Sequence, residues 1–310
     1  MSVPEVKREE QINEIDLAEQ KETSPVVMKE ESYLGMAFRR FKKHKLAVAG
    51  AIFMIFLTVV AIFAPLISPY DPYHVTDTFS GPPSKEHWLG TDQVGRDVLS
   101  RLIYAARVSL LVGVGSVAIS TVIGVFLGLI SGYYGGKTDM IIMRVVDVMM
   151  SFPPILLVLV AVSIVGPNLR NLILIIGLIA WASVARLVRG SVLSIKQLDY
   201  IKASIALGLG TPRILFSHIL PNVMAPVLVH ATFFMAAVII IEASLSFLGA
   251  GVQPPTASWG NMLTSAQSLT VLTSQPWLWV PPGLMIFITV LSVNFIGDGL
   301  RDALDPKSVK

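Results

Sequence analysis

The sequence predicts an all-α membrane protein with six transmembrane helices, on the basis of its composition and the length of its apolar runs. Of its 310 residues, 53% are hydrophobic and 15% are charged, whereas a water-soluble domain has about 25% charged residues. A helix needs about 20 mainly apolar residues to cross the hydrocarbon core of a bilayer. Six runs meet this length: Leu46–Ile67, Val108–Ile130, Met140–Val165, Leu172–Val192, Val223–Leu248 and Val280–Ile296.

The chain before the first apolar run changes sharply in charge. Residues 1–35 carry nine acidic and four basic residues, and residues 39–45 carry five basic residues and no acidic one. This composition predicts an acidic cytosolic tail over residues 1–35, disordered or loosely helical. A signal peptide would begin with its basic residues and have a short apolar core. The run beginning near Leu46 is therefore expected to be a retained anchor helix.

Basic residues are distributed unevenly between the two sides of the predicted bundle. With the N-terminus inside, the short cytosolic regions hold 15 Lys and Arg, and the exterior loops hold four: Lys85, Arg96, Arg101 and Arg170. Cytosolic loops of membrane proteins carry the excess of Lys and Arg. Both termini and the segment 199–222 are therefore predicted to face the cytosol.

Two exterior segments are long enough to form structure. Residues 68–106 are rich in proline and turn residues, and residues 251–279 have no charged residue but contain Trp259, Trp277 and Trp279. Tryptophan at this depth normally marks the lipid–water interface, which favours a re-entrant or surface-lying cap over the bundle. The alternative is a surface that meets a soluble partner or lines a substrate entrance.

Few ionisable residues lie in or near the predicted spans. An ionised acid at the bilayer centre costs about 2.5–3.5 kcal/mol, so we expect Glu242 to face the bundle or a wet cavity. It would either line the translocation path or bond to a neighbouring helix or loop. Arg144 and Asp147 are three residues apart and could pair on one helix face, which favours a structural latch over a substrate site. Arg186 and Arg189 are expected to snorkel to the cytosolic surface.

The second predicted span is rich in glycine and ends in a glycine-rich turn. Gly124, Gly128 and Gly132 recur every four residues, a spacing that allows a neighbouring helix to approach closely. The following stretch, Ser131–Thr138, nearly matches a phosphate-binding P-loop. That motif requires glycine at position 131 and a preceding strand, whereas the chain has serine after a membrane helix. We interpret the stretch as a cytosolic turn. The sequence contains no other P-loop-like motif, so another polypeptide must hydrolyse ATP.

The segment 199–222, DYIKASIALGLGTPRILFSHILPN, predicts two short helices joined by a turn. The first has an apolar face formed by Ala203, Ala206, Leu207 and Leu209. Gly210 suits a C′ position, where a positive φ costs least, Thr211 is a plausible N-cap, and Pro212 suits N1 of the second helix. Pro221 is expected to end that helix before the next span. The alternative is an amphipathic helix lying on the lipid surface.

Several stretches of the chain resemble one family. The spacing Ala203-Ser204, Gly208 and His218-Ile219-Leu220-Pro221 resembles the EAA coupling loop of permease subunits in binding-protein-dependent ABC importers. Further motifs resemble the C-type permease subunit of the dipeptide/oligopeptide/nickel branch: His87–Asp92 with Gly95–Asp97, Met143–Asp147 with Phe152-Pro153, Glu242–Gly249, Gly251–Pro255 with Trp259-Gly260, and Gly297–Pro306. The resemblance covers about residues 36–306, with the motifs in family order.

The resemblance implies a fold and a boundary. The fold is that of type I ABC importer permeases, the MetI-like fold. The permease domain would cover residues 36–310, with a core over residues 105–305 and the coupling loop at residues 199–222.

The resemblance also implies a mechanism. The loop would lie in a groove of a cytosolic ATPase and convert its closure into helix movement through Lys202, Ala203, Ser204, Gly208, His218, Leu220 and Pro221. Lys202 replaces the glutamate that names the loop, which places in doubt any salt bridge to an arginine of the partner. Taken by itself, His218 is expected to cap its helix.

The implied assembly contains a second, similar permease, two cytosolic ATPases and an extracytoplasmic binding protein, in the bilayer of a bacterial cell membrane. It would move peptides inward by alternating access. ATP would be used by the partner subunits, and neither nucleic acid nor a cofactor bound to this chain is expected.

The sequence offers no motif of catalysis. We find no paired carboxylates, no metal-ligand cluster and no nucleophile with a base, so we expect a subunit that is not an enzyme. Three alternatives stay open. The same family could carry nickel or another small solute, two copies of this chain could replace the heterodimer, or the chain could be an ATP-independent carrier. A carrier would need ion sites near the midplane, usually with inverted repeats, and the sequence shows no such repeat.

Overall fold

The computed structural model describes residues 33–304, so the predicted acidic tail lies almost wholly outside the described residues. The chain divides into two units at residue 36, and the described residues from 37 onward belong to the larger one, unit 37–310. Helix α2 (Tyr33–Lys43) is the first described element. Within the described residues, all further regular elements are helical apart from one isolated bridge between Thr91 and Asp97.

The described residues contain five helices that are long and apolar enough to cross a membrane. Their bounds are Lys45–Ile62 (α3), Val98–Tyr134 (α5), Leu169–Ile195 (α8), Thr211–Phe247 (α10, η1 and α11 in continuation) and Val280–Leu304 (α14). A bent pair of shorter helices supplies a sixth span when it is counted as one. The all-α fold and the number of spans agree with the sequence prediction.

The third predicted span is not one straight helix. Helix α6 (Gly136–Met150) and helix α7 (Pro154–Val165) meet at 87°. The break falls at Phe152 and Pro153, because a residue that precedes proline is pushed away from the helical region and proline lacks an N–H for the helix ladder. The composition of the apolar run Met140–Val165 predicted a span but did not predict the break within it.

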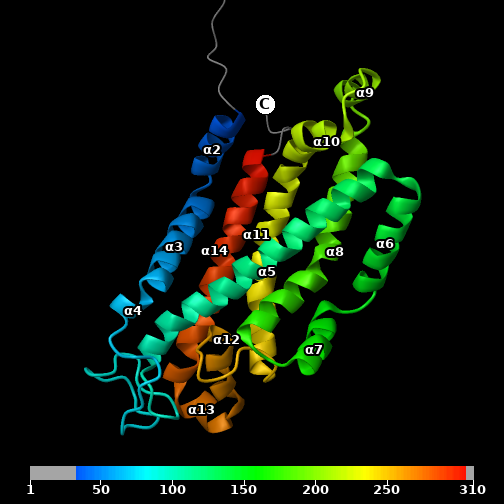
Figure 1. The fold of residues 1–310 in the computed structure, drawn as a ribbon. Helices are drawn as coiled ribbons and strands as arrows, with labels where there is room; N and C mark the ends of the chain where they lie inside the picture. Colours follow the sequence, from blue (N-terminus) through cyan, green and yellow to red (C-terminus); the bar gives the residue numbers. More distant parts are fainter. Residues whose placement is uncertain (1–32, 305–310) are drawn as a thin grey trace, which may run out of the picture. The chain divides into compact units, whose positions relative to one another are not determined.

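The two ends of unit 37–310 differ. In Figure 1, α9 (Asp199–Ala206) and α10 (Thr211–Arg213) lie at one end, which we call the coupling end. The short helix α4 (Ala64–Ile67) and the segments 68–97 and 251–279 lie at the other, which we call the outer end. Helix α5 crosses α8 and α11 obliquely, and its 37 residues extend roughly 55 Å, more than a bilayer core of about 30 Å.

The predicted glycine ridge of α5 packs against α8. A Cβ added at Gly128 would lie 2.6 Å from the Cβ of Val188 and 2.7 Å from the carbonyl oxygen of Ala185, and one at Gly132 would lie 2.7 Å from the Cβ of Val192. Real Cβ atoms do not approach other atoms this closely, so both positions need glycine. The prediction of close helix approach along this ridge is confirmed.

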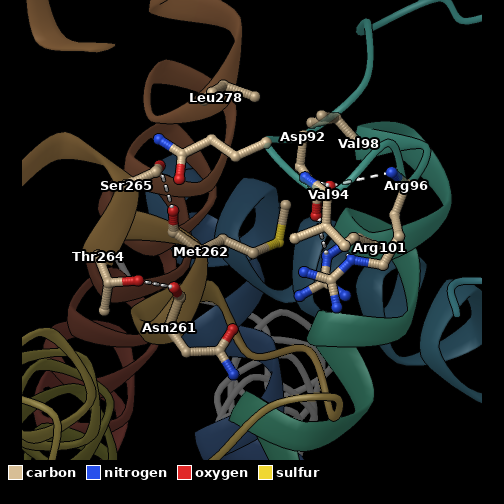
Figure 2. Close-up of a pocket in the computed structure, with 11 residues that line it drawn as sticks. Asp92, Val94, Arg96, Val98, Arg101, Asn261, Met262, Thr264, Ser265 and Leu278 are labelled. Carbon is tan, nitrogen blue, oxygen red and sulfur yellow. Dashed lines mark hydrogen bonds and ion pairs between the residues drawn. The ribbon is translucent and has the colours of Figure 1, made fainter. Parts of the chain in front are cut away.

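The outer end is covered by four short helices: α12 (Trp259–Met262), η2 (Leu263–Gln267), α13 (Leu269–Ser274) and η3 (Pro276–Leu278). We call residues 251–279 the cap. Between the cap and the segment 92–101 lies a cavity of about 180 Å³ (Figure 2). The cap predicted from the tryptophan-rich sequence is therefore built from short helices.

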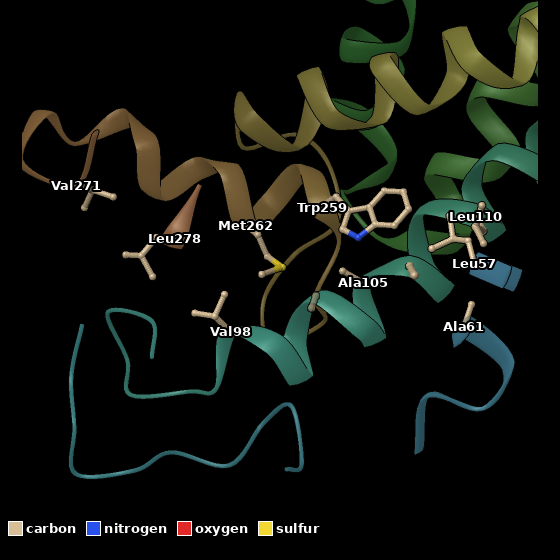
Figure 3. Close-up of a cluster of buried hydrophobic side chains, with 11 residues drawn as sticks. Leu57, Ala61, Val98, Ala105, Leu110, Trp259, Met262, Val271 and Leu278 are labelled. Carbon is tan, nitrogen blue, oxygen red and sulfur yellow. The ribbon is translucent and has the colours of Figure 1, made fainter. Parts of the chain in front are cut away.

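A buried apolar cluster holds the cap on the bundle (Figure 3). Trp259 has 0% of its surface exposed and packs with Val98 and Ala105 of α5 and Leu57 of α3. Its indole nitrogen donates a hydrogen bond to the carbonyl of Leu102 at 3.3 Å. The expectation that this tryptophan marks the lipid–water interface is wrong, because its ring lies inside the protein.

Candidate coupling site

The segment 199–222 forms two helical pieces joined by a tight turn, as the sequence predicts. The first is α9, and the second begins with α10 and runs through the π-helix η1 (Ile214–Ile219) into α11 (Leu220–Phe247). We call this segment the coupling element. It projects at the coupling end, where Figure 1 shows α9 and α10 beyond the ends of the long helices.

The turn between the two helices uses Gly208 at its left-handed position, where Gly210 was predicted. Gly208 has φ +76°, in the left-handed region, whereas Gly210 has φ −60° and ψ 142° and is the N-cap of α10. The N–H of Gly208 bonds to the carbonyl of Ile205 at 3.0 Å, and that of Leu209 bonds to Ser204 at 3.2 Å. This pair of bonds is the Schellman motif, which fixes where α9 ends.

The second helix also begins at a different residue from the predicted one. Because Gly210 is the N-cap, Thr211 is the first residue of the helix and not its cap, and Pro212 is the second. Proline is tolerated in the first turn, where its missing N–H would have no partner. The expected start was therefore displaced by one residue.

Pro221 does not end the second helix, and this expectation is wrong. The N–H of Leu220 bonds to the carbonyl of Leu215, five residues back, so the helix widens to a π turn just before the proline. The wide turn accommodates a residue that lacks an N–H and whose ring would clash with the carbonyl four residues earlier. His218 consequently lies inside a continuous helix and does not cap one.

The coupling element is fixed to the bundle by apolar contacts. Ile201 of α9 and Ile219 of η1 are fully buried in one cluster with Val188 and Val192 of α8. Polar contacts support this packing. The side-chain amide of Asn222 donates to the carbonyl of His218 at 2.6 Å and to the hydroxyl of Tyr200 at 3.3 Å, and Lys196 at the end of α8 donates to the carbonyl of Tyr133 at 2.7 Å.

The outer surface of the element is apolar. Leu207 is 80% exposed, Phe216 61% and Ile205 43%, and the small residues Ala203 and Gly208 are exposed between them. Exposed apolar patches rimmed by polar residues mark interaction sites. Lys202 lies on the same helix and its ammonium is 3.7 Å from the carboxylate of Asp199, a surface pair worth little energy.

Helices α6 and α8 are joined by two ion pairs near the coupling end. Asp139 receives two bonds from the guanidinium of Arg189, at 2.7 and 2.6 Å, and one of 2.5 Å from the hydroxyl of Ser131. Asp147 pairs with Arg186. The expected pair between Asp147 and Arg144 is therefore wrong. Arg186 and Arg189 were expected to extend to the cytosolic surface, but both pair with carboxylates of α6.

Glu242 lies buried at the outer end of α11, with 1% of its surface exposed. Its carboxylate accepts hydrogen bonds from Ser246 at 2.8 Å and from Ser109 of α5 at 3.4 Å. Ser109 in turn accepts from the N–H of Trp259 at 3.3 Å. The carboxylate therefore joins two long helices and the cap.

Replacing Glu242 by alanine should loosen the cap. The change leaves buried serine hydroxyls without an acceptor, at a cost of about 1–3 kcal/mol. We expect amide hydrogen exchange over residues 251–267 to rise about tenfold, because 1.4 kcal/mol corresponds to a factor of ten. The matched variant Glu242→Gln keeps the volume and an acceptor oxygen and should exchange nearly as the wild type. Equal exchange in the alanine and glutamine variants would contradict this role.

One charged residue of α5 was assigned from the sequence neither to a loop nor to a span. Arg107 falls between the predicted exterior segment, which ends at residue 106, and the predicted span, which begins at Val108. It is exposed beside a groove of about 350 Å³, lined mainly by apolar residues of α3 and α5 with Met235 of α11. Extending the span by three helical turns, as the length of α5 requires, would have placed this arginine within it.

Within residues 33–304, no group of three or more His, Cys, Asp or Glu is placed to hold a metal ion. The carboxylates of Asp139, Asp147 and Glu242 are bound to arginines or serines. The arrangement supports a mechanical role, because the coupling element is rigid and is joined to both α8 and α11.

Two family models match the chain. Residues 124–310 match the binding-protein-dependent transport system inner membrane component, and residues 32–83 match the N-terminal TM domain of oligopeptide transport permease C.

Curated relatives match most of the chain. It is 45% identical over 273 residues to the dipeptide transport system permease protein DppC of Alkalihalophilus pseudofirmus, covering 87% of this chain and 89% of the relative. It is 43% identical to the oligopeptide transport system permease protein OppC of Bacillus subtilis, with 87% and 88% covered. The glutathione transport system permease protein GsiD of Pectobacterium atrosepticum is 44% identical, with 87% and 90% covered.

A solved structure supports the fold. An inward-facing conformation of the MetNI methionine ABC transporter has a chain that superposes with a TM-score of 0.54 at 21% sequence identity, covering 66% of this chain and 96% of that chain. At this identity the likeness concerns the fold alone. It agrees with the MetI-like fold that the sequence predicts.

Proposed function

The chain belongs to the family of inner membrane components of binding-protein-dependent transport systems, and from this premise we propose that it is the C-type permease subunit of an importer of di- or oligopeptides. It is a multi-pass membrane protein and the non-catalytic component of an ABC importer, in which a separate subunit hydrolyses ATP. Relatives of this chain are named dipeptide, oligopeptide and glutathione permeases, which supports a peptide as the substrate.

The coupling element is the observation that carries the mechanism. Its exposed tip, with Leu207 and Phe216, offers an apolar surface to an ATPase groove, and its buried side is packed on α8 and continues directly into α11. A push on the tip therefore moves two long helices together. The coupling residues expected from the sequence divide accordingly: Lys202, Ala203 and Gly208 contact the ATPase, and Ser204, His218, Leu220 and Pro221 shape the element.

The assembly that fits this role has three kinds of partner subunit. A component of this family works with an ATPase and a binding protein. In the proposed transporter a second, similar permease completes the pathway, two ATPases lie in the cytosol, and both termini of this chain face the cytosol. The excess of Lys and Arg at the coupling end supports this orientation.

Two carboxylates have structural roles in this proposal. The buried carboxylate of Glu242 accepts hydrogen bonds from serines of α5 and α11, and the exposed carboxylate of Asp147 pairs with Arg186. Both carboxylates therefore already have partners within the subunit. We therefore propose that both hold helices in place and that the transported peptide is bound elsewhere.

Reconstituted vesicles test this function. The chain is assembled with its partner permease, ATPases and binding protein, and uptake of labelled di- and pentapeptides is measured with ATP inside or outside the vesicles. Uptake should require ATP on the side of the coupling element and the binding protein on the other. Uptake driven by a proton gradient without ATP would overturn the proposal. Uptake of nickel but of neither peptide would overturn the substrate alone.

A further inference from the structure

Two arginines and one carboxylate surround the outer cavity between the segment 92–101 and the cap. The cavity is lined by Arg96 and Arg101, by Asp92, and by uncharged residues that include Asn261 and Ser265 (Figure 2). Asp92 is the one acidic residue among those that line it, so the walls carry a net positive charge. No residue of α8 or α11 contributes, and the cavity therefore lies apart from the helices that the coupling element would move.

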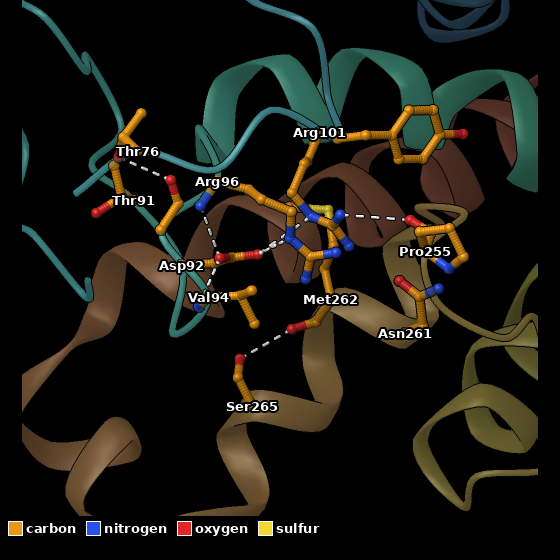
Figure 4. Close-up of polar contacts among 12 residues, drawn as sticks. Thr76, Thr91, Asp92, Val94, Arg96, Arg101, Pro255, Asn261, Met262 and Ser265 are labelled. Carbon is orange, nitrogen blue, oxygen red and sulfur yellow. Dashed lines mark hydrogen bonds and ion pairs between the residues drawn. The ribbon is translucent and has the colours of Figure 1, made fainter. Parts of the chain in front are cut away.

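Asp92 is already occupied by its own segment. Its Oδ1 atom accepts the backbone N–H groups of Val94 and Arg96, both at 2.9 Å, and its Oδ2 atom accepts the Nε–H of Arg96 at 2.8 Å (Figure 4). These bonds form a turn that holds Arg96 against Asp92. Three of the about four acceptor sites of this carboxylate are therefore used by its own segment.

The guanidinium of Arg101 consequently makes only long polar contacts within the described residues. Among the described residues it contacts Asp92, with 3.4 Å between Nε and Oδ2, and the carbonyl of Pro255, 3.4 Å from Nη1. Its side chain is 5% exposed. A guanidinium has five N–H donors, and burying a charge is costly unless it is paired and hydrogen-bonded. Most donors of this buried guanidinium lack a close acceptor within the described part of the chain.

The opposite wall of the cavity adds no negative charge. Asn261 uses its amide group to bond the carbonyls of Val252 and Thr256, and Ser265 donates its hydroxyl to the carbonyl of Met262 at 2.9 Å. These bonds make the wall rigid. A ligand that enters between the walls meets fixed dipoles on one side and a guanidinium with free donors on the other.

We propose that this cavity is a socket for one acidic side chain of the extracytoplasmic binding protein, whose carboxylate pairs with Arg101 when the binding protein docks. The inference rests on the proposed function, because it needs a binding protein on the outer face. Arginine and carboxylate match in geometry and can form two parallel hydrogen bonds. A volume of about 180 Å³ admits an Asp or Glu side chain and is smaller than the 300–1,000 Å³ typical of pockets for whole small ligands.

The test compares docking in matched variants of the complete transporter in nanodiscs. The binding protein is the one that supports uptake by the wild type, and its Kd is measured at low salt. Arg101→Gln should weaken binding about tenfold or more, because removing one partner of a buried charge pair raises the dissociation rate strongly. Lys85→Gln removes one positive charge from an exposed site of the same outer segment, away from the cavity, and should change the Kd less than threefold.

Competition by a free carboxylate gives a second readout. Replacing chloride by acetate at constant ionic strength should weaken docking to the wild type and leave docking to Arg101→Gln unchanged. If Arg101→Gln fails to assemble, Ser265→Asp replaces it, since a carboxylate attached to the cavity wall would occupy the socket and weaken docking in a folded protein. ATP hydrolysis without binding protein should stay at the wild-type rate in each assembled variant.

Other outcomes separate the two proposals. If no binding protein stimulates the wild type, the proposed function fails and the socket with it. If the wild type responds but Arg101→Gln and Lys85→Gln bind the binding protein equally well, the socket alone is overturned. Acetate or peptide that binds the wild-type transporter without changing docking would also overturn it, in favour of a small-ligand site.

Discussion

Gly208→Val should reduce ATP-driven uptake about tenfold, while Gly210→Val should transport nearly as the wild type. Gly208 has φ +76° and Gly210 has φ −60°. The left-handed region costs an L-residue about 1–2 kcal/mol, and the cost is greatest for a β-branched side chain. The space around the two glycines is similar: nothing lies within 4 Å of a Cβ at Gly208, and at Gly210 only the Cδ of Pro212 does, at 3.9 Å. Within the subunit, backbone conformation is therefore the main difference between the variants.

The readout is peptide uptake and ATP hydrolysis in the same vesicles. A strained turn tilts α9 and displaces the apolar tip, so the Gly208→Val variant should still bind the binding protein but lose stimulated ATP hydrolysis. Gly208→Asn is the graded control, because asparagine tolerates the left-handed region better than other residues. It should retain more uptake than valine. Equal loss in the valine variants at Gly208 and Gly210 would contradict the assignment of the turn.

Gly128→Ala should destabilise the folded subunit by about 1–3 kcal/mol, the usual cost of overpacking. The added methyl would lie 2.6 Å from the Cβ of Val188 and 2.7 Å from the backbone oxygen of Ala185. Neither atom is the flexible end of a side chain, so helices α5 and α8 must separate. Because α8 leads into the coupling element, their separation also moves the buried contact of Ile201.

Gly113→Ala is the matched control on the same helix. Its methyl would meet the side chain of Met235 at 3.5 Å, an ordinary van der Waals contact, while the gain in helix propensity is the same. In detergent, the midpoint of thermal unfolding should fall by several degrees for Gly128→Ala and stay at or above the wild type for Gly113→Ala. Similar midpoints for the two variants would show that α5 and α8 are not held at this distance.

Local chemistry made most of the fold predictable. Apolar length located the spans, and the four-residue spacing of Gly124, Gly128 and Gly132 predicted the close approach of another helix. The helix–turn–helix of residues 199–222 could also be predicted, since its glycines and prolines act on the backbone within a few residues. The order of the motifs was sufficient to indicate the family, which the comparisons show.

The predictions for the coupling element were wrong where the local sequence allows a helix to end at more than one residue. Gly208 and Gly210 can both end a helix, and the buried contacts of Ile201 and Ile219 with α8 select the register that places Gly208 at C′. Pro221 can end a helix or follow a π turn, and it follows one here because the chain continues as α11. Periodicity within the segment does not distinguish these cases.

The sequence by itself determined the class of the protein, its spans, the coupling element and the family. These features depend on composition and on contacts between residues close together in the chain. Only the tertiary structure decided which charges meet. It paired Asp147 with Arg186, enclosed Glu242 between serines of α5 and α11, and left Arg101 buried beside a carboxylate that Arg96 already occupies. The physical reason is that an ion pair depends on distance in space, and helix packing brings together residues such as Asp139 and Arg189 that are far apart in the sequence.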